Sequence, residues 1–486
     1  MRLIAWLLIP ILIASSHAQT TAPAGGSAIS PEQWAQLPPQ VKLGIRGAQA
    51  QMLMPVIDRV VLVPDGATYL DEISKWSPQG RWPVLIEDSQ LAPMFVRRFK
   101  PAQVIRRESV GALPAARDER QKLIEAAVAR GFGGTAGQSP RDAFAAVKFL
   151  PAGVVITSAG DPAWTAAVAL ASGHGQPLAW MDDQIGGMEA ELSEGDARAL
   201  SQRIEQLVKD TGYSYPAMGD DIDAVTLCRL LPPRVRMKLV GPARPELPAD
   251  SDFDGPIALT DFVCRNGDLS RWAFAGWIWG TEARCTYVAM CSLFLPRERV
   301  WMFNGYPTDG AWQGYAMDQA ANVLSASGFN TRTMQAPQAD LGSWKRNVRG
   351  GLTADVVMVN TKGNNDFFDL TQGQARPGDV PVLNTPAAVY FIHSWSMQQP
   401  DNRETVGGRW LANGAYAAVG SLWEPYLYAF VPPSLLAQRL ASFVPFLPAA
   451  RWWNNEGPLW MPWRVITIGD PLMLVAPPAQ VAKPRV

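Results

Sequence analysis

The sequence predicts an α/β protein in which tandem small parallel-sheet units precede a larger α/β sandwich domain. Short apolar runs alternate with segments of helical periodicity, as in strand–helix–strand units with right-handed crossovers. Asp-Pro opens one such helical segment and Gly closes it, as is usual at helix ends. Of the 486 residues, 48% are hydrophobic and 18% are charged, so packed cores are expected rather than a disordered chain.

The charge balance is nearly neutral, with 43 basic and 44 acidic residues. Proteins that bind nucleic acid usually carry a basic excess, and polybasic segments attract anionic membrane surfaces. We therefore expect no nucleic-acid partner.

The first 18 residues have the features of an export signal. The chain starts with a positive charge, residues 3–14 form an apolar run too short to span a bilayer, and small residues precede a cut after Ala18. A buried N-terminal helix is the alternative. Gln19 follows the cut, so no lipid anchor is expected, and no later segment is suited to cross a membrane. The mature protein is expected in the periplasm or outside the cell, with a flexible lead-in over 19–55.

Two α/β units are predicted next. Residues 56–145 form the first unit, with strands over 59–64, 83–86 and 103–105 and helices over 69–76 and 94–99. Residues 146–230 form the second unit, with strands over 152–157, 177–180 and 224–227 and helices over 164–172 and 194–209. The two units are either a diverged duplication or simply two units of similar spacing.

Residues 231–297 interrupt the alternation. Prolines between 232 and 248 indicate a linker, and the apolar segments 272–279 and 285–295 are strands or a helix that docks the two halves. The four cysteines lack the CxxC spacing of a zinc site. They form at least one disulfide in an oxidising compartment or stay buried thiols. They are Cys228, Cys264, Cys285 and Cys291.

Residues 298–478 hold the most extended alternation. Strands are predicted over 299–304, 331–334, 355–360, 386–392, 415–420 and 463–468, and helices over 317–327, 341–348, 405–413 and 433–440. In open α/β sheets, a binding crevice lies at the carboxyl ends of the strands. The candidate crevice residues follow the central strands and are Asn360, Lys362, His393, Ser394 and Glu424.

A family resemblance rests on two motifs of this region. The segment 411–424, Leu-Ala-Asn-Gly-Ala-Tyr-Ala-Ala-Val-Gly-Ser-Leu-Trp-Glu, resembles the helix–strand signature of caspase-like folds, as in gingipain-type peptidases and caspase-like CHAT domains. The run from Trp463 to Gly469-Asp470-Pro471 is similar to the closing strand of gingipain-like bacterial proteins. The resemblance covers residues 298–478 and implies a caspase-like α/β sandwich domain. Its motifs say little about a substrate.

The resemblance also implies a Cys–His dyad, with the histidine after one buried strand and the cysteine after the next. In that chemistry a thiolate attacks the scissile carbonyl and backbone N–H groups hold the oxyanion. Here the histidine position falls near Asn360 or Thr361, and the cysteine position near His393 or Ser394. Because no cysteine occurs after Cys291, family-type catalysis is not expected.

The histidines and Glu424 allow more than one interpretation. His393 beside Ser394 suggests a serine hydrolase, but adjacent strand residues point to opposite faces and are poorly placed as base and nucleophile. Gly173-His174-Gly175 imitates the family's histidine motif, but a helix-end turn with a surface histidine is expected there. Glu424 faces the crevice, caps a loop or pairs with Arg409.

Two further groups are candidate binding sites. Asp220, Asp221 and Asp223 are a weak candidate for calcium, with a turn before a strand as the alternative. Four tryptophans flank the segment 454–456 and form either a platform for sugar or peptide or a satellite core under a loop. These tryptophans are Trp452, Trp453, Trp460 and Trp463.

The expected function is that of an exported, non-catalytic caspase-like protein. It binds an unidentified protein or glycan partner, or serves as a scaffold, at the cell surface or in the periplasm, and no cofactor is expected. A fold that is retained without its dyad motivates this hypothesis, since a fold alone does not imply a chemistry. One alternative is a hydrolase, a peptidase or esterase, with an atypical site around His393 and Ser394. Another is a structural part of a secreted assembly that uses the tryptophan-rich end as its contact.

Overall fold

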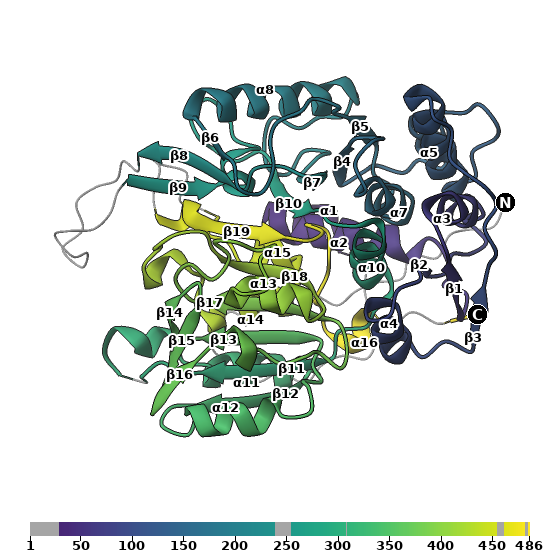
Figure 1. Cartoon of the computed structure of the whole chain (residues 1–486). Coiled ribbons are helices and arrows are strands. Elements are labelled where there is room, and N and C mark those ends of the chain that lie inside the picture. The colour runs from purple at the N-terminus through teal and green to yellow at the C-terminus, as the bar shows by residue number, and fades with distance from the viewer. Residues whose placement is uncertain (1–28, 239–253, 308, 454–460, 482–484) are drawn as a thin grey trace.

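One ten-stranded sheet organises the protein and confirms the predicted α/β class (Figure 1). The computed structural model describes residues 29–238, 254–307, 309–453, 461–481 and 485–486, so the expected signal peptide lies outside the described residues. The strand order is β12-β11-β13-β17-β18-β19-β10-β7-β4-β5. In this order the strands are Asn330–Gln335, Arg299–Asn304, Val356–Asn360, Ala387–Ile392, Ala415–Ser421, Val465–Ile468, Phe274–Ile278, Ala224–Cys228, Gly153–Thr157 and Leu178–Trp180.

The sheet reverses direction between β18 and β19. These two strands pair antiparallel, whereas all other neighbours among the ten described strands pair parallel. The carboxyl ends of β12, β11, β13, β17 and β18 therefore lie at one end of the sheet, and those of the other five strands lie at the opposite end. All five predicted crevice residues belong to the first of these ends.

The strands of the predicted second unit are part of this large sheet and do not form a small sheet of their own. β7 pairs with β4 on one side and with β10 on the other, and every residue of β7 and β10 is buried. A strand buried on both faces needs a neighbour on each side, because unpaired buried N–H and C=O groups are costly. The segment 272–279 supplies this neighbour as β10, and the segment 285–295 falls in the helix α10 (Glu282–Phe294).

The first unit forms a separate three-stranded parallel sheet in the order β2-β1-β3. It docks on α10, since the backbone N–H of Ile86 in β2 donates to Oγ1 of Thr286 over 3.4 Å. Its strands are Val84–Ile86, Arg59–Val63 and Gln103–Arg106, and its helices are α3 (Gly66–Ile73), α4 (Leu91–Phe99), α5 (Arg117–Gly131) and α6 (Pro140–Ala146).

The remaining elements surround the large sheet (Figure 1). α7 (Trp164–His174) is buried along its whole length, and α8 (Glu194–Asp210) buries one stripe, as its periodicity predicts. The other helices are α9 (Leu259–Phe262), α11 (Asp318–Ala326), α12 (Leu341–Val348), α13 (Val406–Ala412), α14 (Pro433–Ala441), α15 (Phe446–Ala449) and α16 (Pro478–Val481). Two small sheets comprise β6 (Glu191–Leu192), β8 (Arg234–Lys238) and β9 (Asp254–Ala258), and β14 (Lys362–Asn364), β15 (Phe367–Leu370) and β16 (Gly373–Ala375).

The expected flexible lead-in over 19–55 needs correction from residue 31 onward. That part forms α1 (Pro31–Gln36) and α2 (Pro39–Met52). Both helices begin with proline, which suits the first helical turn, and α2 buries most of its apolar side chains. The Thr/Ala/Gly-rich composition that indicated flexibility ends before α1, and apolar residues at helical spacing follow it.

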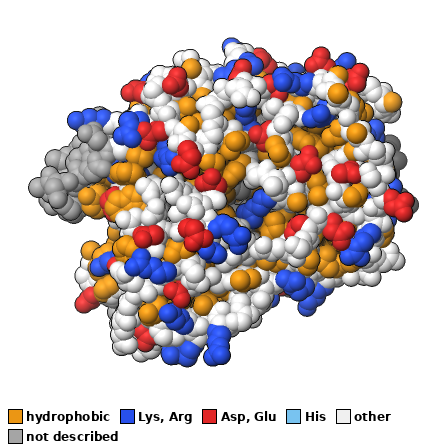
Figure 2. All heavy atoms as spheres, viewed as in Figure 1, with side chains coloured by type: hydrophobic (Ala, Val, Ile, Leu, Met, Phe, Trp, Pro, Cys, Tyr) orange, Lys and Arg blue, Asp and Glu red, His pale blue; other side chains and the backbone are white. Residues whose placement is uncertain are grey.

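No helix among the described residues is long and apolar enough to cross a bilayer. Basic and acidic side chains are interspersed over the face drawn in Figure 2.

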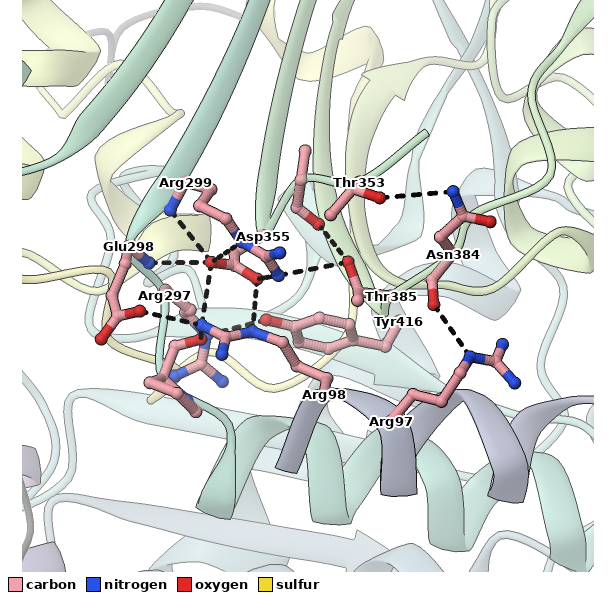
Figure 3. A network of polar contacts seen from close by, with 12 residues as sticks. Arg97, Arg98, Arg297, Glu298, Arg299, Thr353, Asp355, Asn384, Thr385 and Tyr416 are labelled. Atoms are coloured by element: carbon pink, nitrogen blue, oxygen red, sulfur yellow. Dashed lines mark hydrogen bonds and ion pairs between the residues drawn. The ribbon is translucent and has the colours of Figure 1, made fainter. Parts of the chain in front are cut away.

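Asp355 ties the first unit to the large sheet at the amino ends of β11 and β13 (Figure 3). Its carboxylate accepts hydrogen bonds from Arg98 Nε (2.6 Å) in α4 and from Arg299 Nη2 (2.7 Å) in β11. It also accepts from the backbone N–H groups of Glu298 (3.0 Å) and Arg299 (2.9 Å). Burial acts to raise the pKa of Asp355, but the hydrogen bonds from Arg299 and Arg98 outweigh it and hold the pKa below its usual range.

We expect Asp355→Asn to lower the free energy of unfolding by about 3 kcal/mol, because two guanidinium groups then lose their buried carboxylate. Urea denaturation of the protein at pH 7 measures the loss. Asp366→Asn is the control, since Asp366 pairs with Arg376 where both side chains are 57% exposed, and a change below about 0.5 kcal/mol is expected. The pKa of Asp355 is lower in the folded state, so its contribution is present above pH ~4 and is lost as the pH falls below that value. Equal losses in the two variants would contradict this assignment.

Two glycines of α2 give a matched test of how this helix packs. A Cβ on Gly44 would overlap the carbonyl oxygen of Phe443, whereas the nearest atom to a Cβ on Gly47 is the carbonyl oxygen of Leu472 at 3.8 Å. We expect Gly44→Ala to destabilise the protein by about 2 kcal/mol or more, because backbone must move. Gly47→Ala is expected to be neutral or to stabilise by up to about 1 kcal/mol through helix propensity. Thermal unfolding of both variants checks the contrast, and similar melting temperatures would show that α2 does not pack in this way.

Candidate functional site

Neighbouring parallel strands bring the predicted crevice residues into one row. Asn304 of β11, Asn360 of β13 and Ile392 of β17 are register partners at the ends of their strands. His393 follows Ile392, and Ser421 at the end of β18 donates through its Oγ to the carbonyl oxygen of His393 over 2.9 Å. The carboxyl ends of four adjacent strands therefore form one polar, buried layer.

Asn360 lies at the floor of this layer. Its Nδ2 donates to Oδ1 of Asn304 over 3.1 Å and to the carbonyl oxygen of Tyr315 over 2.8 Å. Its Oδ1 has no hydrogen-bond partner among the described residues. The side chain is fully buried, so Asn360 joins β11 to β13 and does not reach the surface.

His393 is locked in one tautomer by its two neighbours. Its Nε2 lies 2.7 Å from the carbonyl oxygen of Asn364, which can only accept, so Nε2 carries the hydrogen. Nδ1 is then an acceptor for the hydroxyl of Thr361 at 2.9 Å. The ring is fully buried and stacks on Phe391 with an interplanar angle of 12°. Burial lowers the pKa of His393 to about 4, so the imidazole is neutral at physiological pH.

Ser394 pairs with Glu424 and not with His393. The Oγ of Ser394 donates to Oε1 of Glu424 over 3.0 Å, and the backbone N–H of Tyr426 donates to the same oxygen over 2.9 Å. Both Ser394 and Glu424 are half-buried. Glu424 thus pairs with Ser394 and caps the loop after β18, whereas Arg409 pairs with Glu404.

Aromatic side chains and one lysine lie at the rim of this polar layer, above its buried members. Lys362 is exposed on β14, and its Nζ lies 4.4 Å from the centroid of the Trp312 ring. Trp395 follows Ser394 with a φ of 54°, a conformation that costs energy for a bulky residue. Its ring meets Trp423 edge to face at 6.2 Å. Lys362, Ser394 and Glu424 are therefore the accessible members of the predicted set, while Asn360 and His393 lie beneath them.

The four cysteines are free thiols, and all of them are fully buried. Of the two alternatives for these residues, the structure has buried thiols and no disulfide. Burial raises the pKa of each thiol, so the thiolate form that attacks electrophiles is scarce at neutral pH. Cys228 ends β7, at the opposite end of the sheet from the crevice.

His174 differs from its predicted setting. It does end a helix, since α7 closes at His174 and Gly175 follows with a φ of 68°. The expected surface position is wrong, because His174 is fully buried and its Nε2 lies 2.8 Å from Oδ2 of Asp470. The hydroxyl of Ser292 donates to the same oxygen of Asp470. This group joins α7 and α10 to the chain that follows β19, and it has no exposed member.

The carboxylates of the three aspartates before β7 accept hydrogen bonds from the turn in which they lie. Asp220 accepts from the backbone N–H of Ala217 (3.0 Å), and Asp221 accepts from the Ser214 hydroxyl (2.9 Å). Asp223 is buried beside Arg46, and its pKa is raised to about 7, since burial outweighs the opposing effect of the Gly219 N–H group and Arg46. No group of three or more acidic, histidine or cysteine side chains suited to a metal occurs among the described residues.

The tryptophan cluster is only partly described. Trp463 is buried under Arg265, whose guanidinium carbon lies 3.7 Å from the ring centroid. Trp452 and Trp453 are half-buried, and their Nε1 groups donate to the carbonyl oxygens of Tyr428 and Pro448. Trp460 and the segment 454–456 lie outside the described residues.

Sequence analysis missed Thr361 and Asn364 as partners of His393. The register of β13 and β17 is the signal that could have identified Thr361. Asn360 pairs with Ile392, so the residues that follow them, Thr361 and His393, are neighbours. Asn364 ends β14, and its carbonyl oxygen reaches the His393 ring just before the turn to β15. The alternation of strands and helices in the sequence does not predict this hairpin. A comparison with protein-family models gives no match for this chain, and neither does a comparison with curated proteins.

The neutral state of His393 can be measured directly. We expect imidazole nitrogen shifts that correspond to the Nε2–H tautomer and that stay constant from pH 8 down to about pH 5. Two-dimensional NMR of the protein with labelled histidine provides the measurement, and Thr361→Val assigns the signal by moving it. The folded pKa lies below the unfolded value of about 6.5, so unfolding takes up a proton and stability falls as the pH drops from about 6.5 to 4. A titration midpoint near 6.5 would contradict the buried geometry.

Proposed function

We propose that this protein is an exported, non-catalytic caspase-like protein that binds or scaffolds at the cell surface or in the periplasm. The observation that carries the proposal is the chemistry at the carboxyl ends of β13 and β17. At the positions where the resembled family places its histidine and cysteine, this chain has Asn360 or Thr361 and His393 or Ser394. β13 and β17 are adjacent and parallel, so these positions lie side by side.

The set of available nucleophiles supports a non-catalytic role. Residues 298–478 contain no cysteine, and the four cysteines elsewhere are buried with raised thiol pKa values. His393 is poorly suited to act as a general base, because the ring and its hydrogen-bond partner Thr361 are both fully buried and burial lowers the pKa of His393 to about 4.

The rim of the crevice supports a partner-binding role. Lys362, Ser394 and Glu424 offer a cation, a hydroxyl and a carboxylate beside half-buried Trp395. Aromatic side chains next to hydrogen-bonding groups suit a peptide or a sugar. We therefore propose a protein or glycan partner at this rim.

One observation favours a hydrolase as the second candidate function. The hydroxyl of Ser394 is half-buried and donates to the carboxylate of Glu424, so a nucleophile and a weak base are within hydrogen-bond distance. The sequence suggested His393 as the base for Ser394. The two side chains do not pair, because both nitrogens of His393 bond to other residues. This version of the hydrolase would depend on Ser394 and Glu424.

Activity-based labelling separates the two functions. We expect no labelling within residues 298–478 when the mature protein is exposed to thiol-directed and serine-directed electrophiles, with adducts mapped by mass spectrometry. Labelling at Ser394 that disappears in Glu424→Gln would establish the hydrolase instead. Ser434→Ala is the control, since Ser434 is a half-buried hydroxyl on α14 outside the crevice and its loss leaves labelling unchanged.

A further inference from the structure

An excess of positive charge is buried where α9 meets the end of the large sheet. Asp261 in α9 accepts from Arg271 Nη2 (2.6 Å), Arg451 Nη1 (2.5 Å) and Arg265 Nη2 (3.1 Å). The four residues are 2% to 8% exposed. Three guanidinium groups thus share one carboxylate, and no second carboxylate among the described residues forms an ion pair with them.

Such a charge excess is costly without a counter-ion. Moving an ion from water into the protein interior costs several kcal/mol, and Asp261 can offset only one of the three charges. Two further observations agree with this imbalance. Burial lowers the pKa of Arg265 to about 9, with the neighbouring arginines acting in the same direction, and burial lowers that of Arg451 to about 10. Both shifts are reduced by Asp261 and would be reduced further by a second anion.

The arginines line a small cavity, and the buried side-chain atoms of its described lining residues that lack a hydrogen-bond partner are all donors. Asp261, Arg265, Arg271, Arg451 and Trp463 are among its lining residues, and its volume of about 10 Å³ is room for about one water molecule or one monatomic ion. Four buried N–H groups of these residues have no acceptor among the described residues: Nε and Nη1 of Arg271, Nε of Arg451 and Nε1 of Trp463.

The unpartnered atoms are N–H donors, so the ligand that fits this cavity must accept hydrogen bonds. A water molecule in such a cavity would accept from these donors, but its own two hydrogens would need acceptors. Among the side chains that line the cavity, only the Asp261 carboxylate is an acceptor, and it already bonds to three guanidinium groups. Arg265 is already satisfied by Asp261 and by the carbonyl oxygen of Leu269. An anion needs only donors and also balances the excess charge. We propose that the cavity between Arg271, Arg451 and Trp463 is a binding site for one small monatomic anion of the chloride class.

The proposed anion is linked through Arg451 to β19, the strand that connects the two oppositely directed sets of parallel strands. Arg451 also donates to the carbonyl oxygen of Val465 (2.7 Å) and to Oγ1 of Thr467 (3.3 Å), both in β19. A bound anion holds Arg451 in this position and thereby supports β19. The site is separate from the crevice and does not depend on the function proposed for it.

Chloride-dependent stability is the first test. The melting temperature of the mature protein is measured in sodium chloride and in sodium gluconate at equal ionic strength. We expect a saturable rise with chloride and a much smaller effect of the bulky gluconate, because a ligand of the folded state stabilises by mass action. Equal melting temperatures in the two salts would overturn the proposal, since screening acts equally in both.

Variants and diffraction locate the anion. Arg271→Met removes the donors and keeps an apolar side chain near Phe274, and we expect chloride to bind at least about tenfold more weakly. Trp463→Phe removes the indole N–H together with part of the buried ring and keeps an aromatic side chain, and it serves if Arg271→Met does not fold. Arg376→Met is the control at an exposed ion pair and keeps the full chloride effect. Crystals grown with sodium bromide should show an anomalous peak beside Arg271 and Trp463, and its absence would overturn the proposal.

Discussion

The pairing of β19 on both sides is the constraint on which the rest of the structure depends. This strand of four residues pairs antiparallel with β18 and parallel with β10, and it thereby joins two sets of parallel strands that run in opposite directions. Buried hydrogen bonds fix a side chain of β19 and the residue that follows the next glycine. Thr467 donates to the carbonyl oxygen of Ala275 over 2.8 Å, and Asp470, just after the strand, binds His174 and Ser292. Without β19, the edges of β18 and β10 would be buried and unpaired.

The same reversal decides where chemistry can take place. The crevice residues gather at the carboxyl ends of β11, β13, β17 and β18, while the carboxyl ends of β10, β7, β4 and β5 lie at the opposite end. At the first end the polar groups bond mainly with one another. Thr361 and Asn364 occupy both nitrogens of His393, and Glu424 occupies the hydroxyl of Ser394. The imidazole of His393 is therefore neutral at physiological pH and has no nitrogen left for a further partner.

The sequence predicted the elements of the C-terminal region well, because their strands are buried runs bounded by Gly, Pro and Asn. The ends of β13 and β17 coincide with the predicted ends at Asn360 and Ile392, so Asn360 and His393 lie at the expected strand ends. The environment of His174 could not be predicted, since its partner Asp470 is 296 positions away. Helices α1 and α2 were missed because a low-complexity stretch obscured the apolar pattern that follows it.

What the sequence determined by itself is the α/β class, the order of strands and helices in the C-terminal region, and the absence of a cysteine where the resembled family places one. These follow from local patterns and from residue identity, which do not depend on distant contacts. Only the tertiary structure decided that β4, β5 and β7 join the large sheet, that His393 is saturated, and that three arginines share Asp261. Each of these depends on which buried groups meet across long separations in the chain, and the need to pair such groups decides the outcome.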